Sequence, residues 1–263
     1  MQLKIYQIDA FTNKTFKGNS AAVIVLDEWL DAELMQQIAI ENNLSETAFA
    51  KKSANATYEI RWFSPITEID FCGHATLATA FVLFKEDIAL KEVTFIAKAV
   101  GSLTVKQLHD GYIEMTFPNR KPQKVENIPQ ELIKGLSIEP KDVLVNQQTY
   151  FVVYENEEDV YNVEVNLQEI KKLAPLDVTV TAHSKEYDCI SRYFWPANGG
   201  IEDPVTGSMH TGLAPLWAER LNKNNLTAYQ ASARGGVLKC HVSQQNVVIL
   251  GQAVLYLEGS ITL

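Results

Sequence analysis

Two glycine-led segments of this chain have the residue pattern of an anion-binding site. Cys72-Gly73-His74-Ala75-Thr76 and Thr206-Gly207-Ser208-Met209-His210 each lead into an apolar run that is expected to be helical. The first turn of a helix presents unpaired N–H groups and a partial positive charge, and glycine lets a ligand approach the backbone closely. Two such starts can hold a carboxylate or an enolate-like anion. The alternative is that both glycines only permit tight strand-to-helix turns.

Four side chains can move a proton or bind a ligand: His74, Asp203 and Ser208 in or beside these segments, and Glu46 earlier in the chain. Histidine titrates near neutral pH, and Ser208 can cap its helix or bond a ligand. Glu46 stands between polar turn residues and an apolar strand, and a carboxyl at the edge of an apolar cleft suits general acid–base work. The structural alternatives are a capping or core histidine, a solvated acidic turn and a surface glutamate.

The remaining signals are weak, and several familiar sites are excluded. Gly18-Asn19-Ser20 is a turn before a strand, and Arg234 can position an anionic group but has the character of a surface residue. The sequence contains no Walker A loop, no GxGxxG fingerprint, and neither an HExxH nor a GxSxG motif. No group of histidines and cysteines has metal-ligand spacing, so no metal site is expected.

The elements that must position these residues occur twice. Arg61-Trp62-Phe63-Ser64-Pro65 recurs as Arg192-Tyr193-Phe194-Trp195-Pro196, an offset of 192 − 61 = 131. Gly73 recurs as Gly207, an offset of 207 − 73 = 134. Both offsets are close to half of the 263-residue chain, so the repeat has the size of a domain. Two similar halves that face each other enclose one cleft, and we expect the paired segments to point into it.

The pattern of strands and helices predicts an α+β fold. Short β-type runs separated by turn residues predominate, which favours closed or rolled antiparallel sheets. Helices are expected from Asp31 onward, over 129–134 and 167–173, and after each repeated glycine, over 75–84 and 209–221. Residues 75–84 are apolar on all sides, so that helix must be buried, and Pro215 is expected to kink or shorten the last one.

A polar segment with two prolines, 118–124, predicts a domain boundary near the middle of the chain. The N-terminal domain is expected over residues 1–117, completed by a C-terminal strand from about 251–263, and the C-terminal domain over 118–250. Each half is long enough to bury a core of its own.

Composition limits the partners. The formal net charge is −9 and the sequence pI is about 5.1, so a nucleic-acid partner, which requires a basic surface, is not expected. A small anionic substrate remains compatible, because local dipoles can oppose the net charge. Three cysteines without a CxxC pair argue against a disulfide framework. The sequence shows no signal-peptide pattern and no membrane-spanning apolar run, so a cytoplasmic protein without a membrane partner is expected.

Taken together, these motifs resemble the PhzF family, named for phenazine biosynthesis, over essentially the whole chain. The resemblance rests on four segments in order: Asp9-Ala10-Phe11-Thr12 with Gly18-Asn19, Ser45-Glu46-Thr47-Ala48-Phe49, 68–76 and 202–208. It implies the diaminopimelate epimerase fold, with two similar β-rolls, each around a central helix, related by a pseudo-twofold axis. It also implies a homodimer that uses neither a metal nor an organic cofactor.

The resemblance also assigns roles to single residues. In the characterised isomerase of the family, a glutamate that matches Glu46 shuttles a proton between substrate carbons. The implied catalytic set is Glu46, His74, Asp203 and Ser208, and the implied substrate-binding set is Asn19, Gly73, Gly207 and Met209. Met209 stands where a small residue is more usual, and we expect it to narrow the pocket.

We therefore expect a cofactor-independent isomerase, of the epimerase and racemase class or of the intramolecular oxidoreductase class. It would act by proton transfer on a small carboxylate-bearing substrate bound between the domains. The related epimerases use two opposed cysteines, but Thr206 stands where the second would be, so that mechanism is disfavoured. The main alternative is a binding protein of the same fold. A hydrolase with a Cys72 nucleophile is a third, which we expect to lack an oriented cysteine–histidine–carboxylate set.

Overall fold

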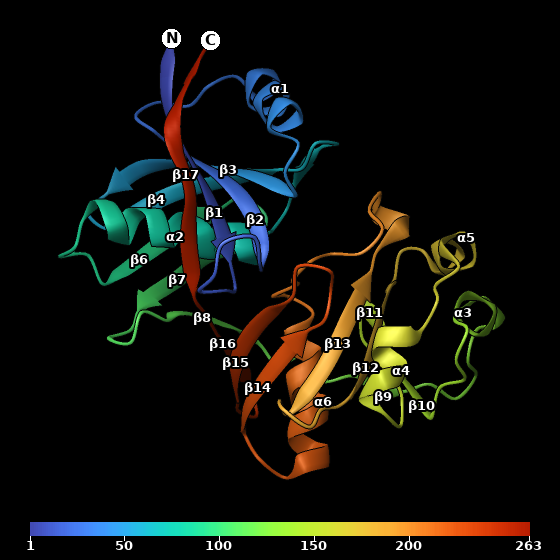
Figure 1. Cartoon of the computed structure of the whole chain (residues 1–263). Coiled ribbons are helices and arrows are strands. Elements are labelled where there is room, and N and C mark those ends of the chain that lie inside the picture. Colours follow the sequence, from blue (N-terminus) through green and yellow to red (C-terminus); the bar gives the residue numbers. More distant parts are fainter. The chain divides into compact units, whose positions relative to one another are not determined.

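The computed structural model describes residues 1–263 and divides them into two units (Figure 1). Unit 1 comprises residues 1–116 and 250–263, and unit 2 comprises residues 117–249. The C-terminal strand therefore belongs to the unit that the N-terminus begins. No helix has the length and apolar character needed to cross a membrane.

Unit 1 is a mixed sheet that packs on the buried helix α2 (Gly73–Glu86) and carries helix α1 (Ala32–Asn42) on its other face. Strand β17 pairs with β1, and the order continues through β2, β3, β4, β6, β7 and β8. The β2–β3 and β4–β6 pairs are parallel, and the other pairs are antiparallel. The strands are β1 (Gln2–Ala10), β2 (Asn19–Leu26), β3 (Glu46–Ala54), β4 (Thr57–Phe63), β5 (Glu68–Ile69), β6 (Glu92–Ala97), β7 (Gly101–Gln107), β8 (Ile113–Pro118) and β17 (Ala253–Thr262).

Alternation along the strands decides which side chains reach α2. Phe49 on β3 and Ile24 on β2 pack with Met35 of α1 in one apolar cluster. Because successive side chains of a strand point to opposite faces, Glu46, three residues before Phe49, faces the α2 side. Asn19, five residues before Ile24, does the same.

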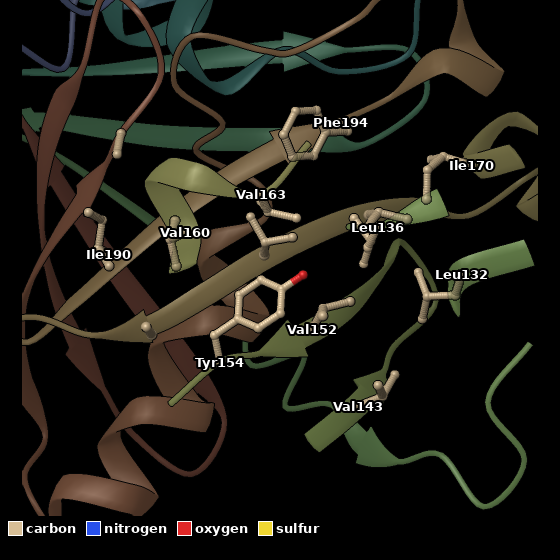
Figure 2. Packing of buried hydrophobic residues seen from close by; sticks show 14 of the residues in the cluster. Leu132, Leu136, Val143, Val152, Tyr154, Val160, Val163, Ile170, Ile190 and Phe194 are labelled. Atoms are coloured by element: carbon tan, nitrogen blue, oxygen red, sulfur yellow. The ribbon is translucent and has the colours of Figure 1, made fainter. Parts of the chain in front are cut away.

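Unit 2 contains helices on both faces of a second mixed sheet. Helix α6 (His210–Leu221) packs on β14 and β15, and the short helices contribute to a separate cluster of buried side chains (Figure 2). That cluster joins Leu132, Val160 and Ile170 from three helices to Val152 and Val178 from the sheet. The remaining helices are α3 (Gln130–Gly135), α4 (Glu157–Asn162), α5 (Leu167–Ile170), η1 (Lys171–Leu173) and η2 (Pro196–Asn198).

The strands of unit 2 pair in the same pattern as those of unit 1. The sequence of parallel, antiparallel, parallel and antiparallel pairs from β2 to β7 recurs from β11 to β15. The strands are β9 (Gln123–Lys124), β10 (Asp142–Val145), β11 (Thr149–Val153), β12 (Asp177–His183), β13 (Cys189–Phe194), β14 (Asn225–Gln230), β15 (Gly236–Val242) and β16 (Asn246–Gly251).

The repeated sequence motif is also a repeated contact. The Arg61 guanidinium donates two hydrogen bonds of 2.7 Å to the Glu68 carboxylate, and Arg192 donates two of 2.8 and 3.0 Å to Glu202. A bidentate arginine–carboxylate pair holds both groups in one plane. In each unit it ties the end of a strand, β4 or β13, to the segment that leads to the repeated glycine.

Several predicted elements differ from the structure. Helix α2 is buried along nearly its whole length, as its composition requires. The helix expected over 209–221 begins one residue later, at His210, because residues 207–209 form a turn. Pro215 lies inside α6 without ending it, so the expected shortening is wrong. Asp31 occupies the N-cap position of α1, but its side chain makes no capping hydrogen bond. Helix α4 and strands β10, β14 and β15 were not predicted.

The turn at Gly18, directly before β2, leads to a stability prediction. Gly18 has φ +65°, and a Cβ there would lie 2.1 Å from the Ala10 carbonyl oxygen. Gly101 has φ +76°, but a Cβ there would meet nothing within 4 Å. We expect Gly18→Ala to lower the free energy of unfolding by about 3 kcal/mol or more, and Gly101→Ala by about 1 kcal/mol. Urea unfolding checks this, and equal losses would show that the close approach at Gly18 has no energetic effect.

Candidate active site

In unit 1, a buried carboxylate meets a buried imidazole. Glu46 is the first residue of β3, and His74 is the second residue of α2. Glu46 Oε2 lies 2.9 Å from His74 Nε2, and the two residues are 7% and 5% exposed. No hydrogen-bond donor is aligned on Oε2, so this contact is an electrostatic one with imperfect hydrogen-bond direction. A carboxylate in this position has little solvation from water and depends on the imidazole for its stability.

The other ring nitrogen of His74 faces the Asn19 amide. Asn19 Nδ2 lies 3.2 Å from His74 Nδ1, and Ser45 Oγ donates to Asn19 Oδ1 at 3.0 Å. In this arrangement the Asn19 NH2 group faces the ring. Nδ1 is then the acceptor, and in the neutral imidazole Nε2 carries the proton that faces Glu46. Asn19 and Ser45 thus orient His74.

Cys72 completes this group of side chains. Its Sγ lies 3.4 Å from His74 Nδ1 and 3.9 Å from Nε2. The expectation that an oriented cysteine–histidine–carboxylate set is lacking is therefore wrong, because the packing of β3 on α2 brings Glu46 to the two residues. Burial, reinforced by the Glu46 charge, raises the pKa of the Cys72 thiol to about 11. The thiol is protonated at neutral pH, which disfavours a nucleophilic cysteine.

The charge of His74 responds to two opposing effects. Burial by itself lowers its pKa, but the Cys72 sulfur and the Glu46 carboxylate together raise the pKa well above the ordinary histidine value. Since the Cys72 thiol is neutral at pH 7, the lasting contribution comes from Glu46. A second ring proton would face the Asn19 amide NH2 group, so full protonation requires that amide to turn.

The start of α2 supplies backbone donors beside this pair. Gly73 is the first residue of the helix, and Cys72 at the N-cap position makes no side-chain capping bond. The first turn holds no acidic residue. The N–H groups of this turn and the positive end of the helix dipole are therefore not covered by a side-chain cap, and they can receive an anionic group.

In unit 2, Ser208 belongs to a chain of hydrogen bonds whose direction is fixed by a carboxyl. Asp177 accepts from Tyr193 Oη at 2.5 Å and from Asn198 Nδ2 at 3.0 Å. Gln148 Nε2 donates to Tyr193 Oη at 3.1 Å and to Ser208 Oγ at 2.9 Å. Because Asp177 as a carboxylate only accepts, the Tyr193 oxygen must accept from Gln148. Ser208 then accepts from Gln148 and keeps its own proton for another acceptor.

Asp177 is the repeat equivalent of Glu46, and the sequence analysis missed it. The offset 177 − 46 = 131 equals that of the arginine motifs, and the strand register agrees: Thr47 pairs with Phe63, and Val178 with Phe194. The offset itself was the signal that would have found it. Both units place a carboxyl at the start of the equivalent strand, and both connect it to the residue after the repeated glycine.

The acidic turn of unit 2 is held by a buried amide. Thr206 Oγ1 donates to Asp203 Oδ2 at 2.5 Å, and Gln230 bonds the Thr206 backbone N–H, the Thr206 hydroxyl and the Asp203 carbonyl. The Thr206 hydroxyl is thus engaged within the turn, in agreement with the argument against a second acid–base group there. Met209 is fully buried at the N-cap of α6.

The predicted site residues therefore form two groups. Unit 1 brings together Glu46, His74, Gly73 and Asn19, with Ser45 and Cys72 as additional members. Unit 2 holds Asp203, Gly207, Ser208 and Met209 on one segment, with Gln148, Tyr193, Asp177 and Gln230 as unpredicted supports.

The Glu46–His74 contact predicts a titration shift. If the carboxylate raises the pKa of His74, Glu46→Gln must lower it, because the neutral amide no longer stabilises the imidazolium. We expect the NMR titration of the His74 ring to move to lower pH in this variant. Glu41→Gln, at an exposed glutamate of α1, is the matched control and should leave the ring unchanged. An unaltered His74 titration in Glu46→Gln would contradict the assigned contact.

Asp177 predicts a pH-dependent stability. Burial raises its pKa from 3.8 to about 6 against the opposing hydrogen bonds, so the folded protein holds a proton that the unfolded chain releases at lower pH. The associated stability is present below about pH 4 and is lost as the pH rises through about 6. Relative to Asp177→Asn, the wild-type free energy of unfolding should fall by roughly 2–3 kcal/mol between about pH 3.5 and 7.

Urea unfolding at several pH values measures this difference. Asp188→Asn is the control of opposite sign, since Lys223 lowers the pKa of Asp188 although burial opposes it. The prediction is contradicted if the free energies of unfolding of wild type and Asp177→Asn differ by the same amount at every pH. Asp177 would then have the same pKa in the folded protein as in the unfolded chain.

Comparison with known proteins identifies the chain's relatives. The family model PhzC-PhzF, described as phenazine biosynthesis-like protein, matches residues 8–259. An uncharacterized isomerase of Pseudomonas aeruginosa is 44% identical over 263 residues, covering 100% of both chains. The crystal structure of a PhzF-family phenazine biosynthesis protein from Enterococcus faecalis superimposes with a TM-score of 0.95 at 42% identity, covering 100% of both chains.

The predicted fold class is confirmed by a more distant structure as well. A hydroxyproline epimerase from Agrobacterium vitis shares the fold with a TM-score of 0.62 at 9% identity, covering 99% of this chain and 92% of that one. The α+β, epimerase-like architecture and the PhzF-type motifs lead to the same assignment. The chain therefore belongs to the PhzC-PhzF family of phenazine biosynthesis-like proteins.

Proposed function

We propose that this protein is a cofactor-independent isomerase that moves a proton on a small carboxylate-bearing substrate. The observation that carries the proposal is the buried contact between Glu46 and His74 beside the uncapped start of α2. Relatives named as isomerases, at 44% and 45% identity over the whole chain, support the reaction type.

Glu46 is the proposed base. It takes a proton from a carbon next to a carbonyl or an unsaturated group, and the electron pair of that C–H bond moves into the adjacent system as an enolate-like anion. The same carboxyl then returns the proton to another position, so no external acid or oxidant is needed.

The neighbouring groups have supporting roles in this proposal. The N–H groups at the start of α2 stabilise the anion as it forms, and His74 holds the Glu46 carboxylate through Nε2. By family resemblance, Ser208 and Asp203 contribute to the same substrate, and the Ser208 hydroxyl is polarised to donate its proton to a substrate oxygen. A cytoplasmic homodimer without metal or organic cofactor is part of the same proposal and rests on the resemblance.

Hydrogen exchange at carbon tests the proposal. Candidate amino and hydroxy acids incubated with the protein in D2O should gain deuterium at carbon, and Glu46→Gln should lower the exchange rate by about 100-fold or more. Glu41→Gln is the matched control and should exchange at the wild-type rate. Exchange that Glu46→Gln leaves unchanged would remove Glu46 as the base. Stoichiometric binding of an acid without any exchange would favour a binding protein of the same fold.

A further inference from the structure

The side chains around Glu46 have the composition of a metal centre, although the sequence spacing did not indicate one. A carboxylate oxygen of Glu46, Cys72 Sγ and a ring nitrogen of His74 all lie within 4.8 Å of one another, and all three residues are buried. Thiolate, imidazole and carboxylate are the donors that proteins use for Zn²⁺. We propose that Glu46, Cys72 and His74 form a binding site for a thiophilic divalent cation such as Zn²⁺, and that the bound cation blocks the proton chemistry of Glu46.

The distances between the donor atoms suit a single ion. Metal–ligand lengths in tetrahedral zinc sites place two ligand atoms about 3.3–3.6 Å apart. Cys72 Sγ lies 3.9 Å from His74 Nε2, and Glu46 Oε2 lies 2.9 Å from the same nitrogen. Small movements of the flexible Glu46 and Cys72 side chains therefore bring the three atoms to coordination distance, while His74 stays fixed on α2.

A second observation is that the Glu46 oxygen next to His74 has no aligned hydrogen-bond donor. This oxygen, Oε2, is buried, and the Glu46 side chain is only 9% exposed. A buried carboxylate oxygen in this condition is stabilised strongly by a cation. When Cys72 gives its proton to solvent, the thiolate and the carboxylate together carry two negative charges, which a divalent cation neutralises.

The surroundings provide the support that metal ligands need. Asn19, which accepts a hydrogen bond from Ser45, contacts His74 at Nδ1, and Nε2 faces Glu46. Coordination through Nε2 places the ring proton on Nδ1, and the Asn19 amide must then turn so that its oxygen accepts that proton. An outer contact of this kind orients the imidazole and strengthens metal binding. Glu46, Cys72 and His74 each keep a small exposed fraction, between 5% and 7%, through which an ion can enter. Three protein ligands leave a fourth position for water.

The cation would act as an inhibitor of the proposed function. Coordination occupies the Glu46 oxygen and the His74 nitrogen together, so neither can receive or orient a substrate proton. The binding step is independent of the proposed isomerase activity, and only the inhibition rests on it. The metal-site proposal and the isomerase proposal can therefore be contradicted separately, because metal binding is measured without any substrate.

Titration of the metal-free full-length protein with Co²⁺, and competition by Zn²⁺, tests the site. Wild type should bind one equivalent per chain with a thiolate-to-cobalt charge-transfer absorption in the near ultraviolet. Cys72→Ala should lose this absorption and bind the ion at least about 10–100-fold more weakly. Cys240→Ala is the matched control, since Cys240 is also a buried thiol but belongs to no such cluster, and it should behave as wild type.

Three results would overturn the proposal: no stoichiometric Co²⁺ binding by wild type, a complex without thiolate absorption, or unchanged binding by Cys72→Ala. Circular dichroism of each variant establishes that it is folded. Glu46→Gln separates the two proposals, because it should keep the thiolate absorption with weaker affinity even though it lacks the proposed base.

Discussion

One buried electrostatic contact, that of the Glu46 carboxylate with the His74 imidazole, constrains how β3 and α2 meet in unit 1. Burying either charged group alone costs desolvation free energy, and the attraction between the two groups offsets part of that cost. The contact requires that β3 begins at Glu46 with its side chain on the α2 side, and that α2 begins within one residue of Gly73. The apolar length of α2 and the cluster between the sheet and α1 hold these two starts in place. The acid–base chemistry proposed here is a consequence of that packing.

Unit 2 repeats the construction with different side chains. The carboxyl is Asp177 in place of Glu46, and Ser208 stands where unit 1 has His74. The shorter carboxyl does not contact its partner directly; Tyr193 and Gln148 connect them by hydrogen bonds. One half of the duplicated fold thus carries a carboxylate–imidazole pair that can exchange a proton. The other half carries a hydrogen-bond chain that orients a hydroxyl.

The sequence predicted the features that local pattern controls and missed those that packing controls. The motif repeat, the buried helix after Gly73 and the α+β class followed from composition and periodicity. The start of α6 lies one residue after the expected Met209, because residues 207–209 form a turn whose residue types also suit a helix start. Gln230 carries no recognisable motif, so its part in the site was not predicted; its amide holds Asp203 and Thr206 only because β14 packs beside that turn. The Glu46–Cys72–His74 cluster was missed because Glu46 precedes Cys72 by 26 residues. The pairing of β2 with β3 and the packing of both strands on α2 bring these residues together in the fold.

A crystal structure with a substrate or a copurified small acid bound would test the central claim most directly. The account predicts that the reacting carbon lies about 3–3.5 Å from a Glu46 carboxylate oxygen, with an anionic group of the ligand on the N–H groups at the start of α2. A ligand bound away from Glu46, or a Glu46 side chain turned into bulk water in the complex, would contradict it.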